Sequence, residues 1–166
     1  MRETNEYRLP LLDDEKEIKE YLKECFRCGE TEVIICQDLL WKDFSKWVQM
    51  MQDNADYGNG DWGKSLLLLS FVDSRIVGIL CVRYDLCPAL QGQYGNIGYH
   101  VRPSERRKGS ATQMLRHALN ICKEKGLQRV IIGCRSDNAA SKAVIKKCGG
   151  ALIEQKERNS YYECKL

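Results

Sequence analysis

A short β-like stretch at residues 96–101 leads into a basic loop, and a strongly amphipathic helix starts directly after that loop. Backbone amides at a helix N-terminus, beside cations and a glycine that allows close approach, form a receptor for phosphate. This strand–loop–helix unit favours an α/β arrangement and predicts a phosphate-bearing ligand. Its six central residues are Arg106, Arg107, Lys108, Gly109, Ser110 and Ala111.

Length and charge limit the other possibilities. The chain has 166 residues, so we expect one domain, residues 1–166, with a substantial core. The formal net charge of +3 is too small to indicate nucleic acid as a partner. The polar N-terminus does not resemble a signal peptide, and no apolar run is long enough to span a bilayer. We therefore expect a cytoplasmic protein that does not bind a membrane.

The cysteines indicate reduced thiols rather than disulfides or a metal site. There are 9 cysteines, an odd number scattered mostly through apolar patterns. Cys25 and Cys28 form a C-x-x-C pair, but neither His100 nor His117 provides a second ligand pair at zinc-finger spacing. Cys25 also falls on the apolar face of an expected helix, so the sequence predicts no metal.

Hydrophobic periodicity and turn residues divide the chain into alternating elements. The expected strands are residues 7–12, 66–72, 76–82, 93–101, 130–134, 151–157 and 161–166. The expected helices are residues 13–29, a segment carrying Leu40, Phe44, Trp47, Val48 and Met51, residues 111–125 and residues 138–147. We expect a loop at 53–63 and an irregular segment at 86–92. A helical crossover between two parallel strands predicts an α/β (α+β) fold, a mixed central β-sheet flanked by helices on both faces.

The basic loop has a recognisable pattern. Residues 106–111 fit R/Q-x-x-G-x-G/A, the preceding strand ends in Val101-x-Pro103, and residues 137–141 open the next helix after a strand. With this element order, the chain resembles the GNAT superfamily of N-acetyltransferases, and residues 98–109 resemble a bacterial subgroup of predicted acetyltransferases. The resemblance is strong over residues 95–150 and topological before them.

The resemblance implies acetyl-CoA as the co-substrate, without a metal. The main chain at Tyr99 and Val101 would pair with the pantetheine arm, as an added strand pairs with a sheet. Amides of residues 107–111 would surround the pyrophosphate. Arg106 and Lys108 would add positive charge.

The next helix would complete the cofactor site. The resemblance places Asn138 on the pantetheine arm, and Ser141 near that arm or near the adenosine phosphates. Simpler interpretations exist for individual residues: residues 106–108 as a solvated turn, Asn138 or Asp137 as a helix N-cap, and Ser110 as a cap. Those interpretations do not explain why loop, glycine and second motif occur in this order.

The implied reaction is direct attack of a primary amine, most simply of a small molecule, on the acetyl thioester. Relatives often carry a tyrosine acid where this chain has Ile145 and a glutamate base near Asn96, and neither residue here transfers protons. The catalytic residues are therefore unassigned. The side chains that remain as stand-ins are Tyr99, Tyr161, Tyr162, Asp85 and His100. The gap leaves a second hypothesis, an acyl-CoA-binding sensor with little catalysis.

A competing motif occupies residues 58–65, which match the phosphate-binding pattern G-x-x-x-x-G-K-[ST]. Such a loop must follow a strand and open a helix. Here an expected helix precedes it and an expected strand follows, so we interpret the match as a coincidence, with a nucleotide-binding protein as the remote alternative. As partners we expect a small-molecule amine and no nucleic acid, and we allow for a homodimer.

Overall fold

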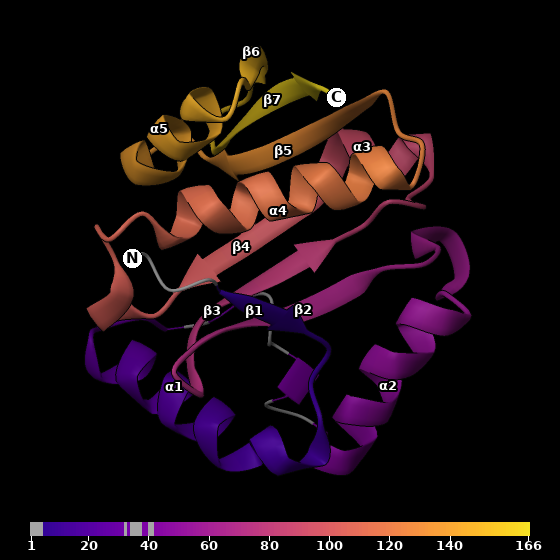
Figure 1. Ribbon diagram of the computed structural model, residues 1–166. Helices are drawn as coiled ribbons and strands as arrows, with labels where there is room; N and C mark the ends of the chain where they lie inside the picture. Colours follow the sequence, from indigo (N-terminus) through magenta and orange to yellow (C-terminus); the bar gives the residue numbers. More distant parts are fainter. Residues whose placement is uncertain (1–4, 32, 34–37, 40–41) are drawn as a thin grey trace.

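The computed structural model describes residues 5–31, 33, 38–39 and 42–166. Its strands are β1 (Glu6–Arg8), β2 (Leu66–Val72), β3 (Arg75–Val82), β4 (Ile97–Val101), β5 (Arg129–Arg135), β6 (Ala151–Gln155) and β7 (Asn159–Lys165) (Figure 1). Its α-helices are α1 (Glu15–Arg27), α2 (Phe44–Asp56), α3 (Pro88–Tyr94), α4 (Ser110–Glu124) and α5 (Ala139–Lys147). Short 3-10 turns are formed by Leu12–Asp14, Gly60–Trp62 and Pro103–Glu105.

The first strand is shorter than predicted. β1 ends at Arg8 because Pro10 cannot donate a hydrogen bond to a strand ladder. The carboxylate of Asp14 then closes a turn by accepting hydrogen bonds from the Leu11 amide at 2.7 Å and from Arg8 at 2.7 and 2.8 Å. α1 follows as predicted and ends before Gly29, whose φ is +87°.

The second helix and the loop after it also differ from prediction at their ends. Asp43 caps α2 by accepting hydrogen bonds from the amides of Ser45 and Lys46. The helix continues to Asp56, into the stretch predicted as loop. Its predicted apolar face is buried at Trp47, Val48 and Met51, whereas Leu40 lies outside the described residues.

The two strands expected at 66–72 and 76–82 are present as β2 and β3, and they form an antiparallel hairpin. Asp73 and Ser74 have φ values of +48° and +63°, as a two-residue hairpin turn requires. The segment after the hairpin contradicts the prediction, because residues 88–94 form helix α3 rather than an irregular segment and the start of a strand. Pro88 occupies the first helical turn, where a missing N–H is tolerated.

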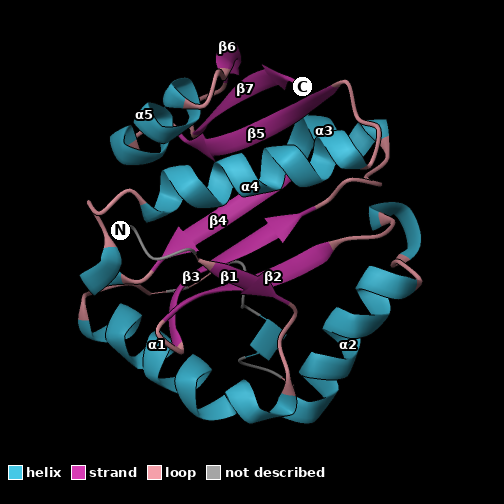
Figure 2. Ribbon diagram, in the orientation of Figure 1, coloured by secondary structure: helices cyan, strands magenta, loops and turns pink. Residues whose placement is uncertain are grey.

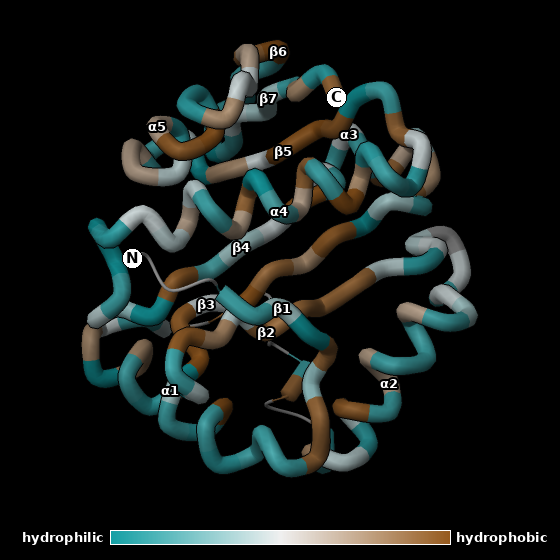
Figure 3. Tube along the Cα trace, in the orientation of Figure 1, coloured by the Kyte–Doolittle hydropathy of each residue, from teal (hydrophilic) through white to brown (hydrophobic). Residues whose placement is uncertain are grey.

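Two antiparallel sheets and three covering helices build the core. The strand orders are β1-β2-β3-β4 and β5-β7-β6. α1 and α2 cover one face of the first sheet around Tyr21 and Trp47, and α4 covers the other face through Met114 and Leu115 (Figure 2). Apolar segments accordingly concentrate in β2, β3 and β5 (Figure 3). The fold class, with helices on both faces, is as predicted.

The predicted parallel pairing is limited to one point. α4 connects β4 to β5, and the two strands run in the same direction (Figure 1). No ladder joins them in the described part of the chain, so the sheet is split instead of continuous. The hydrogen bonds that connect the two strands involve Asn96 and Ile131.

Candidate cofactor site between the two sheets

Asn96 holds the closed end of the split. Its amide donates to Ile131 O at 2.6 Å, and its side-chain Oδ1 accepts from Ile131 N at 2.8 Å. Its Nδ2 donates to Arg83 O at 3.0 Å, and the residue is 0% exposed. Gly95 permits the contact, since a Cβ there would lie 2.8 Å from Ile131 O. Past this seam, β4 and β5 separate.

The separation leaves β4 with an unpaired edge. Main-chain groups of successive residues in a strand point to opposite sides. The Arg102 amide donates to Val77 O of β3 at 2.9 Å, so position 102 faces the paired side. The main chains of Tyr99 and Val101 therefore face the open edge. The Tyr99 hydroxyl lies 2.8 Å from Ser141 Oγ, which brings together two predicted site residues from β4 and α5.

The loop between β4 and α4, residues 102–109, contains predicted phosphate-binding residues and is called the phosphate loop below. It ends at a helix N-terminus without a side-chain cap. Gly109 has φ +90° and ψ 0°, a left-handed conformation, and a Cβ there would meet nothing within 4 Å. Ser110 does not cap α4, because its hydroxyl donates to Glu105 O at 3.3 Å. The amides of the first turn of α4 are thus open to a ligand, beside exposed Arg107 and a Lys108 that pairs with Glu105 at 3.0 Å.

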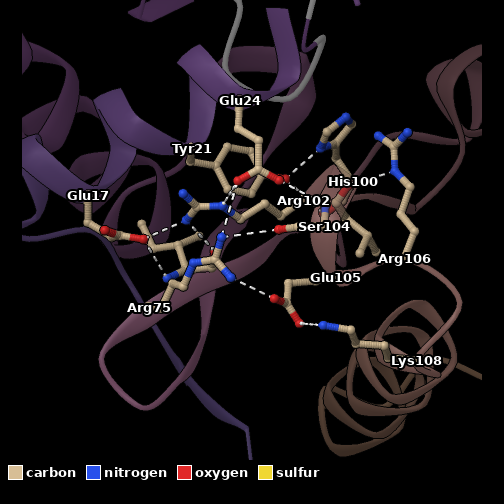
Figure 4. Close-up of polar contacts among 12 residues, drawn as sticks. Glu17, Tyr21, Glu24, Arg75, His100, Arg102, Ser104, Glu105, Arg106 and Lys108 are labelled. Atoms are coloured by element: carbon tan, nitrogen blue, oxygen red, sulfur yellow. Dashed lines mark hydrogen bonds and ion pairs between the residues drawn. The ribbon is translucent and has the colours of Figure 1, made fainter. Parts of the chain in front are cut away.

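Carboxylates on α1 anchor the start of this loop (Figure 4). Arg102 is 5% exposed, and it donates to Glu24 and to Glu17 at 2.6 Å each. Glu24 also accepts from the Ser104 amide at 2.8 Å and from Arg75 at 3.2 Å. Burial opposes the charge on Glu24, but its hydrogen bonds outweigh burial and lower its pKa to about 2. No sequence pattern marked this cluster, since its partners are 78 and 85 residues apart.

Arg106 does not extend outward from the loop. Its Nε donates to Val101 O at 3.0 Å, and its terminal nitrogen is ion-paired with Glu30. The other oxygen of Glu30 lies 2.6 Å from His100 Nε2, and His100 Nδ1 lies 2.5 Å from the Tyr21 hydroxyl. This chain of contacts links the phosphate loop, the turn after α1 and the α1 face of β4.

The N-terminus of α5 faces the open edge of β4. Asn138 is the N-cap, since its Oδ1 accepts from the Ser141 amide at 3.0 Å. Asp137 is not the cap, because its carboxylate pairs with Arg135 at 2.7 Å. The capping interpretation of Asn138 is thus confirmed, and its Nδ2 remains the atom that can meet a ligand.

The positions expected to lack a proton-transfer group, and two of the proposed stand-ins, are buried. Ile145 and Asn96, which replace the acid and base that relatives often carry, are both 0% exposed, and Ile145 packs in the core beside α4. Tyr161 donates to Gln93 O at 3.0 Å, and Tyr162 is 2% exposed. Tyr99 remains at the open edge, and burial raises its pKa to about 12, which keeps its hydroxyl protonated.

The phosphate-binding pattern at 58–65 does not have the structural context that such a loop needs. Residues 58–65 lie between α2 and β2, the reverse of the order a phosphate loop needs. A Cβ at Gly63 would lie 2.3 Å from Asp85 O, so its glycine serves close packing. Donor atoms of Cys25, Glu30 and His100 lie within 4.8 Å of one another, and contacts join Glu30 to His100 and to Arg106. Burial raises the pKa of Cys25 to about 12.

A polar hollow of about 450 Å³ adjoins the site at the carboxyl end of β5. It is lined by Arg135, Ser136, Asp137, Glu157, Arg158 and Asn159. Asp137 directly precedes the cap of α5, so the hollow lies next to the predicted cofactor residues.

In the described part of the chain, no helix has the length and apolar character needed to cross a membrane.

An open strand edge, an uncapped helix N-terminus and a glycine-containing basic loop define a class of α/β proteins that bind phosphate-bearing cofactors. The chain belongs to the acetyltransferase (GNAT) family, whose model matches residues 17–150. It is accordingly an acetyl-CoA-dependent acetyltransferase of that family. No curated protein matches the chain.

Solved structures share the fold at low identity. The ribosomal L7/L12 α-N-protein acetyltransferase RimL, in complex with coenzyme A, has a TM-score of 0.72 and 17% identity, covering 98% of this chain and 94% of its own. The microcin C7 self-immunity acetyltransferase MccE, in complex with acetyl-CoA and AMP, has a TM-score of 0.70 and 17% identity, and the match covers 100% of this chain and 94% of MccE. The PaiA N-acetyltransferase of Thermoplasma acidophilum, in complex with coenzyme A, has a TM-score of 0.66 and 17% identity, and the match covers 98% of this chain and 99% of PaiA.

Proposed function

We propose that this enzyme transfers the acetyl group of acetyl-CoA to a primary amine of a small molecule by direct attack on the thioester. The observation that carries the proposal is the open edge of β4, which faces the N-terminus of α5 and ends at the uncapped N-terminus of α4. A pantetheine arm has amides that suit a strand edge, and a pyrophosphate suits a helix N-terminus.

Each part of the cofactor has a proposed partner. The arm pairs with the main chain of Tyr99 and Val101, and the amides of residues 107–111 hold the pyrophosphate. Gly109 lets these amides approach, since its left-handed backbone carries no Cβ. Arg106 and Lys108 add charge, and both must first leave carboxylate partners.

The second motif supports the arm from the opposite side. Asn138 offers its Nδ2 to the arm while its Oδ1 caps α5. Ser141, already beside the Tyr99 hydroxyl, lies where the arm passes between β4 and α5. No metal is needed in this scheme.

The acceptor must reach the thioester end of the arm. The arm runs from the N-terminus of α4 along β4 toward Asn96, so the thioester lies toward the closed end of the split, whereas the polar hollow at the carboxyl end of β5 lies at the phosphate end. An alkyl ammonium has a pKa of about 10, so the acceptor must lose a proton before it attacks. Main-chain N–H groups at the open edge would stabilise the oxyanion.

The test combines binding with turnover. Calorimetric titration with acetyl-CoA and, separately, with ATP should show binding of acetyl-CoA only. Thiol release should then be followed with a panel of small amines and of peptides with free N-termini, and we expect release with small amines. Release with peptides only would contradict the acceptor class. Acetyl-CoA binding without thiol release across the panel would favour the acyl-CoA sensor. Ile145 and Asn96, which are buried and cannot transfer protons, are consistent with that alternative. Binding of ATP alone would overturn the proposal.

A further inference from the structure

The side chain of Arg106 lies in part of the proposed cofactor site. Nε of Arg106 donates to Val101 O at 3.0 Å, and that carbonyl lies on the open edge where the pantetheine arm pairs. An amide of the arm cannot donate to Val101 O from the open edge while Arg106 Nε donates to it from the same side. The pyrophosphate is also a stronger partner for the guanidinium than a single carboxylate, because it offers several charged oxygens.

Glu30 is the second holder of Arg106, and it connects the loop to His100. One Glu30 oxygen is ion-paired with Arg106, and the other lies 2.6 Å from His100 Nε2. The side chains of Glu30 and His100 are 20% and 18% exposed, so solvent screens the interaction between these two residues only partly. With Glu30 ionised and His100 neutral, Nε2–H donates to Glu30, and Nδ1 accepts from the Tyr21 hydroxyl at 2.5 Å.

The surroundings of His100 contain few other charges. Its cross-strand neighbour on β3, Ile79, is apolar and 0% exposed. Burial lowers the pKa of His100, Glu30 raises it, and Arg106 lowers it again. The titratable and charged groups that face it among the described residues are Tyr21, Cys25, Glu30 and Arg106.

We propose that Glu30 holds Arg106 over Val101 until acetyl-CoA takes Arg106 away, and that His100 then takes up a proton from solvent and pairs with the released Glu30. Glu30 and His100 are positioning residues in this scheme, which rests on the proposed function. The direction in which cofactor binding changes the proton affinity of His100 follows from the neighbouring charges. Departure of Arg106 removes the cation that opposes protonation and leaves the carboxylate acting on the imidazole alone, so the proton affinity of His100 rises on binding.

The experiment is calorimetric titration of acetyl-CoA at pH values around the ordinary histidine pKa of about 6.5, in buffers with different heats of ionisation. We expect the wild type to take up a fraction of one proton per cofactor bound. His100→Gln should bind acetyl-CoA without this uptake, because the amide still donates to Glu30 but cannot be protonated. His117→Gln is the matched control, since the chain has 2 histidines and His117 lies on α4 stacked on Tyr7.

Glu30→Gln tests the holding contact directly. It should also lose the uptake, and it should bind acetyl-CoA about two- to fivefold more tightly, because a partly exposed ion pair contributes up to about 1 kcal/mol. Glu20→Gln on α1, which removes the exposed Glu20–Lys23 pair, should leave affinity unchanged. Thermal melting of each variant confirms folding.

The outcomes separate the two proposals. Acetyl-CoA binding without proton uptake, uptake that survives His100→Gln, or uptake lost in His117→Gln would overturn the coupling and leave the proposed function intact. Weaker binding by folded Glu30→Gln would overturn the holding role. Absence of any acetyl-CoA binding by the wild type would overturn the proposed function, and the coupling with it.

Discussion

Gly109 and Gly126 mark the two ends of α4 and make a matched pair. Their φ values are +90° and +88°, and a Cβ at either position would meet nothing within 4 Å. Valine at either site therefore costs a similar backbone strain, about 1–2 kcal/mol. Only Gly109→Val should also weaken acetyl-CoA binding, by at least about tenfold, since one charge-assisted hydrogen bond contributes about 1.5–3 kcal/mol. Calorimetry and urea unfolding check both variants, and equal affinities would remove residues 107–111 from the pyrophosphate site.

The hydroxyl pair of Tyr99 and Ser141 joins β4 to α5 across the split. Tyr99→Phe and Ser141→Ala should each lower the free energy of unfolding by about 1 kcal/mol, because each removes one partner of the same hydrogen bond. The double variant should lose less than the sum of the two. With a pKa of about 12, Tyr99 stays protonated, so the effect should be the same at pH 6 and pH 9. Additive losses in urea unfolding would show that the two hydroxyls act independently.

Among the elements, α1 does more than cover the sheet, because its carboxylates fix the start of the phosphate loop. Glu24→Gln should lower the free energy of unfolding at pH 7 by about 1–3 kcal/mol. The folded-state pKa of Glu24 is depressed from 4.5 to about 2, so its stabilisation is present above pH 4.5 and is lost as pH falls through about 2. The gap between wild type and variant in urea unfolding should close over that window. Glu20→Gln on the same helix should show a much smaller gap, because solvent screens the Glu20–Lys23 pair. A Glu24→Gln gap that is constant down to pH 2 would contradict the assignment.

Local sequence patterns predicted the elements whose cause is local. The apolar stripes of α1 and α4 and the Asp73–Ser74 turn follow from side-chain spacing and backbone preference. The expectation of an irregular segment at 86–92 is wrong, because Pro88 begins α3, and proline is tolerated in the first turn of a helix. None of the residues of α3 is buried, so the helix has no apolar stripe that could have predicted it.

The candidate site also contains parts that the sequence predicts and parts that it does not. The loop at 106–111 and the cap of α5 could be placed from sequence, because adjacent residues form them. The contacts of Arg106 with Glu30 and of Arg102 with Glu24 could not, since charged residues carry no periodic signal and these partners are 76 and 78 residues apart. The fold, not the local pattern, decides which cation meets which carboxylate.

The whole molecule consists of two antiparallel sheets that share one of its two hydrophobic cores and are hydrogen-bonded at one seam. One core lies between the first sheet and α1 and α2, and the other lies under α4 and contains residues of both sheets. The seam is narrow, because β4 and β5 are hydrogen-bonded only near Asn96 in the described chain. Because β4 and β5 separate beyond this seam, coupling between the sheets depends on the core under α4 and on Asn96.

Asn96→Ala should therefore affect unfolding more than an average buried substitution. It removes the two side-chain hydrogen bonds and leaves the Ile131 amide and the Arg83 carbonyl without these partners, at a cost of about 2–4 kcal/mol. Because only the main-chain hydrogen bond from residue 96 to Ile131 O then remains at the seam, the urea transition should also broaden, with a lower m-value. Asn120→Ala on the exposed side of α4 is the control and should leave both quantities unchanged. If Asn96→Ala unfolds with the wild-type m-value and midpoint, the seam does not couple the two sheets, and α4 alone holds them together.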